Sequence, residues 1–284
     1  MNAQLLEGKI LAANIQEQIK SILQGFEPPQ LIAIQVSDDP SAEWYINQQE
    51  RLTQKLGVRF KRVRPGEIKT QAELVKTMQD ANARYDGIFL AMPLPPPFNS
   101  DDALRAMDFM KDVEGIHPIN LGNMVLRKTK LIPPTAFAAL ALIESTGIPI
   151  RGKKAVIIGQ SAIVGRPLQL LLGERRATTI VCNTGTLVSD IQKYVSDADI
   201  IVACAGQPNL VKGDWIKSGA VVIDIGTTET NGTLVGDVEF ESASKRAGFI
   251  TPVPGGVGPL TVTMLMQNLA NAYRAQKEVR AVNR

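Results

Sequence analysis

A chain of 284 residues is long enough for one large or two ordinary domains, and its 44% apolar and 21% charged residues are typical of a soluble globular protein. Basic residues exceed acidic ones by three, with no long run of like charge. This argues against nucleic-acid and membrane-surface partners and favours a small molecule. Because it has neither an apolar stretch of membrane-spanning length nor the layout of a signal peptide at the N-terminus, the sequence predicts a cytoplasmic protein.

Cysteine and histidine are scarce in this chain. Two cysteines, Cys182 and Cys204, and one histidine, His117, cannot form a zinc site by themselves and indicate no disulfide framework. We therefore expect no structural metal ion. Both cysteines lie in apolar segments and are predicted to be inert core residues, whereas His117 stands before a proline, which favours a role in shaping a loop.

Helix and strand patterns alternate in the first half of the chain, as they do in proteins with a parallel α/β sheet. Amphipathic spacing predicts helices at 6–23, 42–57 and 72–84, and strands are predicted at 30–37, 58–65 and 85–95. Loops are predicted at 93–100 and 115–124, where proline, glycine and asparagine gather. An apolar helix at 134–147 marks the expected domain boundary.

A second alternating pattern starts near Lys153 and is typical of a Rossmann-like unit. Strands are predicted at 153–159, 178–183, 199–206 and 220–227, with helices at 166–174 and 259–276. The predicted fold class is therefore α/β with two domains. The first domain is placed at 1–138, completed by a C-terminal helix at 260–284, and the second, a Rossmann-like domain, at 139–259.

The turn GQSAIVGRP joins a predicted strand to a helix, where backbone amides and the helix N-terminus can hold a pyrophosphate. It departs from GxGxxG, because Ser161 occupies the second glycine position and the last glycine is displaced by one, to Gly165. Spacing alone leaves two alternatives open, a dinucleotide site and a tight structural turn. The candidate cofactor-binding residues are Gly159, Gln160, Ser161, Val164, Gly165 and Arg166 in this turn, with Thr184 and Thr227 at the ends of later strands.

The segment after the second strand of a Rossmann unit distinguishes NAD from NADP. Here CNTGT carries neither an acid for the adenosine ribose nor a base for the extra phosphate, although Asn183, Thr184 and Thr186 can donate hydrogen bonds. Arg166 and Arg175 are possible substitutes for the missing base. The sequence leaves the choice between the two nucleotides open.

Three segments together resemble the methylenetetrahydrofolate dehydrogenase/cyclohydrolase family of FolD-type bifunctional enzymes: GQSAIVGRP, VVIDIGT followed by VGDVEF, and ITPVPGGVGPLTVTML. The segments LLEGKILAANI, VSDDPSAEWY and KDVEGIHPIN agree with that family in order and spacing, so the resemblance covers nearly the whole chain. It implies a homodimer. The first domain of each subunit is implied to be catalytic and the second to bind NAD(P), with a cleft for a tetrahydrofolate-type substrate between them. It also implies oxidation of 5,10-methylenetetrahydrofolate with NADP, NAD being possible, followed by hydrolysis to 10-formyltetrahydrofolate.

The resemblance assigns roles to residues of the first domain, and at three of them this sequence departs from the family. Tyr45 matches the family tyrosine that packs beside the folate ring. The position of the central catalytic lysine holds Gln49, and that of the glutamine thought to assist it holds Ala91. The aspartate that binds the pterin amino group is replaced by Glu114, so the catalytic candidates are Tyr45, Gln49 and Glu114.

The turn PGGVGP supplies the remaining substrate-binding candidates, Pro254, Gly255 and Gly256. Glycine adopts positive φ readily and lets the backbone approach a flat ring closely. The alternative is a tight turn between domains, and the resemblance favours a loop that lines the ligand.

Loss of the lysine affects the two implied reactions differently. Hydride transfer requires alignment with the nicotinamide and little proton transfer, so it can survive. Hydrolysis requires proton transfer, which the amide of Gln49 cannot perform, and Arg51 and Lys55 point elsewhere on a regular helix. We therefore expect weak or absent cyclohydrolase activity. The alternatives are a related enzyme recruited to a different substrate and a non-catalytic protein that binds folate or nucleotide.

Overall fold

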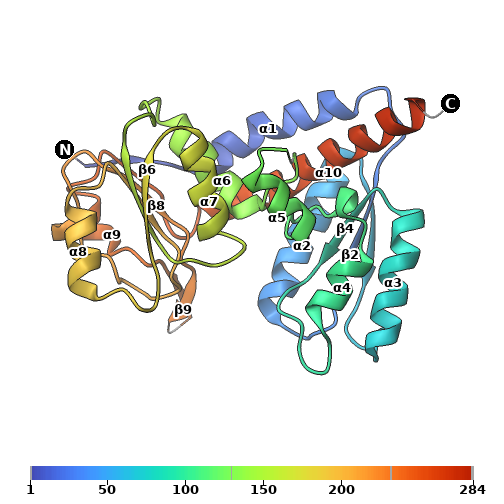
Figure 1. Cartoon of the computed structure of the whole chain (residues 1–284). Helices are drawn as coiled ribbons and strands as arrows, with labels where there is room; N and C mark the ends of the chain where they lie inside the picture. Colours follow the sequence, from blue (N-terminus) through green and yellow to red (C-terminus); the bar gives the residue numbers. More distant parts are fainter. Residues whose placement is uncertain (1, 129, 231, 283–284) are drawn as a thin grey trace. The chain divides into compact units, whose positions relative to one another are not determined.

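The computed structural model describes residues 2–128, 130–230 and 232–282. The chain forms two compact units, both drawn in Figure 1: unit 1 comprises residues 1–13 and 135–261, and unit 2 comprises residues 14–134 and 262–284. It passes between them within α1 (Gly8–Leu23), at the start of α6 (Pro134–Ser145) and within α10 (Val257–Val282). The predicted C-terminal helix is thus present up to Val282, and its last two residues lie outside the described part.

Unit 1 is built on a six-stranded sheet in which every neighbouring pair of strands is parallel. The strand order is β1-β11-β8-β7-β5-β6, so the chain steps outward from β5 to β6 and then returns past β5 to β7. Such a reversal is the switch point at which ligands bind in open α/β sheets. The strands are β1 (Gln4–Leu5), β5 (Lys154–Ile158), β6 (Thr178–Cys182), β7 (Ile200–Ala203), β8 (Val221–Asp224) and β11 (Phe249–Ile250).

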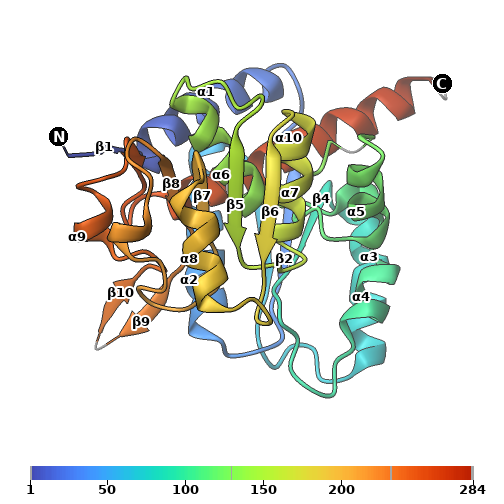
Figure 2. The same cartoon turned by 60° about the vertical axis from the view of Figure 1, so that its left-hand side comes forward.

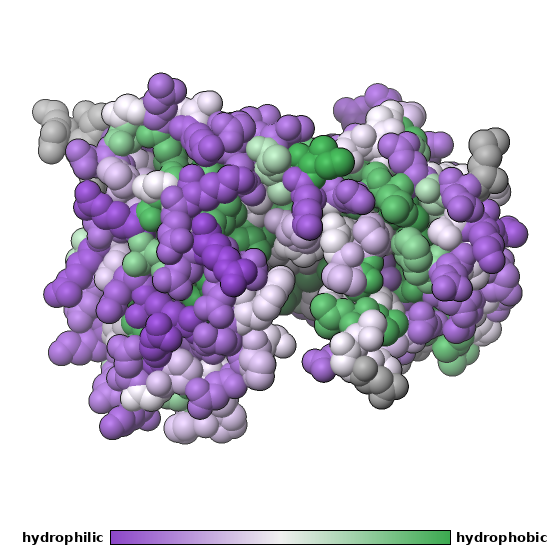
Figure 3. All heavy atoms as spheres, turned by 180° about the vertical axis from the view of Figure 1, so that it is seen from behind, coloured by the Kyte–Doolittle hydropathy of each residue, from purple (hydrophilic) through white to green (hydrophobic). Residues whose placement is uncertain are grey.

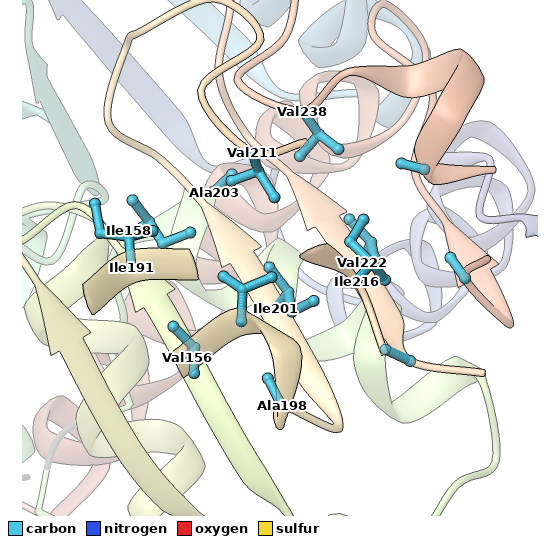
Figure 4. Packing of buried hydrophobic residues seen from close by; sticks show 14 of the residues in the cluster. Val156, Ile158, Ile191, Ala198, Ile201, Ala203, Val211, Ile216, Val222 and Val238 are labelled. Carbon is cyan, nitrogen blue, oxygen red and sulfur yellow. The ribbon is translucent and has the colours of Figure 1, made fainter. Parts of the chain in front are cut away.

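Helices cover both faces of this sheet, α8 and α9 on one side and α6 and α7 on the other (Figure 1). Figure 4 shows the first face, where Val156 of β5 and Ile201 of β7 belong to one apolar cluster with Ile191 of α8. Ala155 and Ile157 alternate with Val156 along β5, point to the opposite face and are also buried. The helices of unit 1 are α6, α7 (Gly165–Glu174), α8 (Val188–Ser196) and α9 (Phe240–Ala243), with the 3-10 turn η2 (Gly213–Trp215).

Unit 2 has three layers around a parallel sheet of order β3-β2-β4. Leu31 and Ala33 of β2 pack with residues of α1, α2 and α10 on one face, and Ile32 and Ile34 pack with residues of α3 and α4 on the other. Figure 2 shows α3 and α4 side by side. The elements are β2 (Gln30–Ile34), α2 (Pro40–Leu56), β3 (Arg59–Val63), α3 (Gln71–Arg84), β4 (Gly87–Leu90), α4 (Ser100–Ala106), η1 (Phe109–Lys111) and α5 (Pro118–Val125).

The predicted loop at 115–124 is wrong, because most of it forms α5. Pro118 occupies the first helical turn, where the missing N–H of proline costs nothing, and His117 precedes it as the cap. The ring Nδ1 of His117 accepts a hydrogen bond from the N–H of Ile119 at 3.1 Å. The histidine therefore has a structural role, as its place beside a proline indicated.

Several short elements were not predicted from the sequence. Strand β1 places the N-terminal residues in unit 1, where it pairs with β11. The antiparallel strands β9 (Thr228–Thr230) and β10 (Thr233–Val235) form a two-stranded sheet. Segments of two or three residues carry too little periodicity to be recognised.

Hydrophilic side chains cover most of the face drawn in Figure 3, and apolar areas are scattered over it. Among the described helices, none is both long and apolar enough to cross a membrane. Within 2–128, 130–230 and 232–282, no group of three or more histidine, cysteine, aspartate or glutamate residues is arranged to hold a metal ion.

Gly87, at the start of β4, tests the packing of unit 2. A Cβ atom at this position would lie 2.5 Å from Cδ1 of Leu269 and 2.7 Å from Cγ1 of Val113. We expect Gly87→Ala to lower the free energy of unfolding by about 1–3 kcal/mol through overpacking, measured by urea denaturation. Gly122→Ala is the control: nothing lies within 4 Å of its added Cβ, and alanine favours the helical conformation at this exposed position of α5. Equal stability of Gly87→Ala and the native protein would contradict this packing.

Candidate functional site

Helix α2 of unit 2 carries two candidate residues, Tyr45 and Gln49, one turn apart. The helix begins where the carboxylate of Asp39 accepts hydrogen bonds from two backbone N–H groups of the first turn. It ends at Gly57, which has the left-handed conformation common after helices, with φ of 70°. Because residues four apart share a helix face, Tyr45 and Gln49 lie on the same side of α2.

The side chain of Gln49 is fully buried, and neither its amide oxygen nor its amide nitrogen has a hydrogen-bond partner among the described residues. Its neighbours along the same face, Ile46 and Leu52, belong to the apolar core. Leaving a buried polar group without a partner costs about 1–3 kcal/mol, so such groups in folded proteins call for an explanation. Both polar groups of the Gln49 amide are therefore buried and unpaired within the described part of the chain.

Glu114 follows a segment that is held in place by three elements of unit 2. The N–H of Val113 donates to a carbonyl of β4 at 3.3 Å, and its carbonyl accepts from Nδ2 of Asn268 in α10 at 2.8 Å. The buried Asp112 accepts at Oδ2 from the N–H of His117 at 2.7 Å. These contacts fix the backbone on both sides of Glu114.

Tyr45 and Glu114 meet through their side chains. The hydroxyl of Tyr45 donates to Oε1 of Glu114 over a long 3.4 Å, and its ring packs edge-on to Phe89 at 5.6 Å between centroids. Burial raises the pKa of Glu114 to about 8; the charge of Asp112 adds to this rise, and the Tyr45 hydrogen bond opposes it. Burial also raises the pKa of Tyr45 well above its usual value. At neutral pH the pair is therefore mainly a neutral carboxylic acid and a neutral phenol.

Ala91 comes directly after β4 and shares one apolar cluster with the ring of Tyr45. Its methyl group offers no hydrogen bond. The cations of α2 point away from the buried face that holds Gln49: Arg51 is exposed, and Lys55 donates to Oε1 of Gln16 at 2.6 Å. This part of unit 2 thus contains the Tyr45 hydroxyl, the buried amide of Gln49 and the Glu114 carboxyl group.

In unit 1, the glycines of the turn between β5 and α7 lie at close approaches of the backbone. Gly159 has φ of 125°, and a Cβ atom there would lie 2.2 Å from the carbonyl oxygen of Cys204. A Cβ on Gly165 would lie 1.9 Å from the carbonyl oxygen of Gly159. Oγ of Ser161 accepts a hydrogen bond from the N–H of Val164 at 3.1 Å. The N-terminus of α7 therefore packs directly on the end of β5.

A cavity of about 680 Å³, here called the β5–β7 cavity, lies at the carboxyl ends of β5, β6 and β7, at the switch point of the sheet. Four of the eight candidate cofactor-binding residues line it, Gly159, Gln160, Ser161 and Thr184, and so do the predicted hydrogen-bond donors Asn183 and Thr186. Outside the lining are Thr227, which is exposed after β8, and three residues at the start of α7, Val164, Gly165 and Arg166. The other lining residues are Ile158, Cys182, Val188, Ile191, Cys204, Ala205, Gln207 and Leu210.

The residues that line the cavity after β7 are Cys204, Ala205, Gln207 and Leu210, and the sequence analysis did not predict them as binding residues. The N–H groups of Ala205 and Gly206 donate to Oδ2 of Asp237 at 2.6 and 2.9 Å, and the N–H of Asp237 donates to Oδ1 of Asp224 at 3.0 Å. Burial raises the pKa of Asp224 to about 7, against the backbone donors that lower it. The sequence did contain a signal for these residues. Ligands bind at the carboxyl ends of parallel strands, and the predicted strand at 199–206 ends here.

The cysteines differ in position. Cys182 is buried, as predicted, whereas Cys204 is half-buried, and both line the cavity. Burial raises the pKa of the Cys204 thiol to about 12 and raises that of Cys182 above its usual value. Both therefore remain neutral thiols, which fits an inert role.

The PGGVGP turn lies in unit 1 and leads into α10. Gly255 has φ of 113°, and its carbonyl oxygen accepts a hydrogen bond from the N–H of Gly8 at 3.1 Å. A Cβ on Gly256 would lie 2.7 Å from Cβ of Thr251. Both glycines thus have a structural cause, and their part in substrate binding, with that of exposed Pro254, stays a prediction.

Two family models match most of the chain. The model described as tetrahydrofolate dehydrogenase/cyclohydrolase, catalytic domain, matches residues 6–114. The model described as tetrahydrofolate dehydrogenase/cyclohydrolase, NAD(P)-binding domain, matches residues 133–277. The first match includes Tyr45, Gln49 and Glu114, and the second includes the residues of the β5–β7 cavity.

Individual relatives agree with these models over nearly their full length. A protein of Myxococcus xanthus named Bifunctional protein FolD 2 is 40% identical over 280 residues, which are 96% of each chain. The N5,N10-methylenetetrahydrofolate dehydrogenase-cyclohydrolase of Trypanosoma brucei, complexed with NADP cofactor and inhibitor, has a TM-score of 0.92 at 34% identity, covering 97% of this chain and 99% of that one. The bifunctional enzyme FolD of Campylobacter jejuni has a TM-score of 0.91 at 36% identity, with 96% and 99% covered.

The raised pKa of Glu114 has a consequence for stability. Below a pH of about 8 the folded protein keeps a proton on this carboxyl that the unfolded chain loses near pH 4.5, so the native protein loses stability as the pH rises between these values. Glu114→Gln binds no such proton. As the pH rises from 5 to 9, the melting temperature of Glu114→Gln is therefore expected to rise relative to that of the native protein. Thermal denaturation of both proteins across this range measures the difference.

Tyr45→Phe is the companion variant in this experiment. Removing the hydroxyl removes the hydrogen bond that lowers the pKa of Glu114, so the pH-dependent loss of stability should extend to higher pH than in the native protein. Parallel melting curves for the native protein and Glu114→Gln at every pH would contradict the raised pKa.

Proposed function

The chain belongs to the tetrahydrofolate dehydrogenase/cyclohydrolase family, and from this membership we propose that it oxidises 5,10-methylenetetrahydrofolate to 5,10-methenyltetrahydrofolate with a nicotinamide dinucleotide. We also propose that its cyclohydrolase activity, which would convert the product to 10-formyltetrahydrofolate, is weak or lost. Family membership supports the first part. The buried amide of Gln49, without a partner among the described residues, is the observation that carries the second.

The β5–β7 cavity has the features that a dinucleotide requires. It lies at the switch point of a parallel sheet, and Gly159 and Gly165 allow the backbone at the start of α7 to come close to a pyrophosphate. The Trypanosoma brucei relative is complexed with NADP, which supports NADP, and NAD is compatible with the same site. The residues proposed to hold the dinucleotide are Gly159, Gln160, Ser161, Val164, Gly165, Arg166, Thr184 and Thr227.

Tyr45 and Glu114 are proposed to bind the pterin part of the substrate. The Tyr45 ring, supported by Phe89, offers a flat apolar surface for stacking. The carboxyl of Glu114 can accept hydrogen bonds from the pterin N–H groups, which favour its ionised form, so we expect substrate binding to lower its pKa from about 8. Ala91, Pro254, Gly255 and Gly256 complete the proposed substrate-binding residues.

Alignment suffices for the oxidation step, since the methylene carbon is activated by its two nitrogens. When bound, the dinucleotide supplies the ring that accepts the hydride. The residues of this chain then have to position the substrate and keep its reacting carbon in place. Tyr45, fixed by Phe89 and Glu114, is suited to that task.

Hydrolysis of the methenyl product needs more than alignment, because water must add and protons must move. General acid–base catalysis by a positioned side chain typically contributes about 10²–10⁴-fold, and a glutamine amide has no useful pKa for it. Ala91 provides no polar group to assist. Glu114 titrates near neutral pH, but the pterin N–H groups are proposed to engage it. The methenyl compound is therefore proposed to leave as the product.

A homodimer remains a prediction from the resemblance, and a cytoplasmic location remains one from the sequence. Composition still argues against a nucleic-acid partner, because basic and acidic residues nearly balance. Light scattering of the purified protein would give the number of subunits directly.

Purified protein is expected to reduce NAD(P) in the presence of methylenetetrahydrofolate while the methenyl compound accumulates. We expect Gln49→Lys to speed hydrolysis of that compound by roughly 10²-fold or more, because lysine restores a group that can transfer a proton. The dehydrogenase rate should gain much less. The measurements are the absorbance of NAD(P)H and, separately, the decay of the methenyl absorbance.

Gln54→Lys is the matched control, because it adds the same charge to α2 at an exposed position, and it should leave both rates unchanged. Hydrolysis by the native protein as fast as its oxidation step would contradict the loss of cyclohydrolase activity. If Glu114→Gln then abolished that hydrolysis, Glu114 would be the group responsible. A protein that binds nucleotide but does not turn over folate before or after Gln49→Lys would instead have a different substrate or a non-catalytic role.

A further inference from the structure

The lining of the β5–β7 cavity consists of uncharged residues throughout the described part of the chain. Its polar side chains include the amides of Gln160 and Asn183 and the hydroxyls of Ser161, Thr184 and Thr186. A carboxylate after the second strand of a Rossmann unit bonds the adenosine ribose of NAD, whereas an arginine nearby accommodates the 2′-phosphate of NADP. This cavity has neither group among its lining residues, so the side chains that line it offer only neutral contacts to the ribose.

Asn183 occupies the deciding position directly after β6, and its side chain is fixed by its neighbours. Nδ2 of Asn183 donates to Oε1 of Gln160 at 3.1 Å, and Oδ1 accepts from the N–H of Gly185 at 2.9 Å. The N–H of Asn183 donates to Oγ1 of Thr186 at 3.0 Å. The amide pair of Gln160 and Asn183 therefore joins the turn after β5 to the turn after β6.

The two arginines that the sequence offered as substitutes lie outside this lining. Arg175 follows the C-terminal end of α7, where its Nε donates to Oε1 of Glu144 at 2.8 Å. The 10 residues of α7 span about 15 Å, which separates Arg175 from the turn where the helix begins. Arg166 stands in the first turn of α7, and its side chain is exposed.

We propose that the amide pair of Gln160 and Asn183 bonds the adenosine ribose of either nucleotide, so that the enzyme uses NAD at least as well as NADP. This inference rests on the proposed dehydrogenase function and specifies which cofactor its site accepts. An amide can donate to and accept from the neutral 2′-hydroxyl of NAD. It cannot neutralise the 2′-phosphate of NADP, which gains most from a cation. Equally, no carboxylate in the described lining repels that phosphate, so NADP is not excluded.

Calorimetric titration of the full chain with NAD⁺ and with NADP⁺, without folate, tests this inference. In the native protein, Kd for NAD⁺ should equal or lie below Kd for NADP⁺. Gln160→Arg should tighten NADP⁺ relative to NAD⁺ by roughly tenfold or more, because a charge-assisted bond to phosphate replaces a neutral contact. Asn183→Asp should shift the ratio of the two Kd values the other way. Gln192→Arg adds a charge at an exposed position of α8 and should leave the ratio unchanged.

A native preference for NADP⁺ of about tenfold, or 1.4 kcal/mol, would overturn the inference. An unchanged Kd ratio in Gln160→Arg that still binds NAD⁺ would overturn the placement of the amide pair at the ribose. Because the titration needs no folate, comparable binding of both nucleotides by a protein without folate turnover would support this inference and contradict the proposed function. Binding of neither nucleotide would contradict both.

Discussion

Strand β5 lies between β6 and β7, and because all three run parallel, their carboxyl ends meet at one edge of the unit 1 sheet. The register fixes that edge: Ile158 pairs with Cys182 on one side and with Ala203 on the other. The residues that follow, including Gly159 and Cys204, are thereby brought together. Their backbones approach so closely that no Cβ fits at Gly159. The cavity, the amide pair and the position of the α7 N-terminus all depend on this parallel pairing.

Amides occupy the decisive positions in both units, Gln49 in one and Gln160 with Asn183 in the other. An amide forms directed hydrogen bonds without the large desolvation cost of a buried ion. Burial keeps Glu114 mainly neutral at pH 7 for the same reason. Amides position their ligands but have no useful pKa for proton transfer, and the Glu114 carboxyl is proposed to be engaged by the pterin. Hydride transfer tolerates this limit, whereas hydrolysis does not, so one physical property accounts for the proposed division between the two activities.

Local patterns in the sequence predicted much of the fold, because strands such as β5 and helices such as α2 carry clear periodicity. The i, i+4 spacing placed Tyr45 and Gln49 on one helix face for the same reason. The contact of Tyr45 with Glu114 joins residues far apart in the chain, and no local pattern contains it. Short-range composition also misled: the glycines and asparagines of 115–124 indicated a loop, but the segment from Pro118 forms a helix capped by His117. The lack of a partner for Gln49 required the packed core to be known.

Two aspartates make the segments VVIDIGT and VGDVEF distinctive, Asp224 in the first and Asp237 in the second. Neither aspartate lines the cavity. The carboxylate of Asp237 accepts hydrogen bonds from the N–H groups of Ala205 and Gly206, which follow β7. The carboxylate of Asp224 accepts one from the N–H of Asp237. The neighbouring glycines admit these carboxylates: a Cβ on Gly226 would lie 2.3 Å from Cγ of Asp237, and one on Gly236 would lie 2.0 Å from Oδ2 of Asp224. Glycine and aspartate are thus required together. The two aspartates thus fix Ala205 and the segment that follows it, and so shape the cavity without lining it.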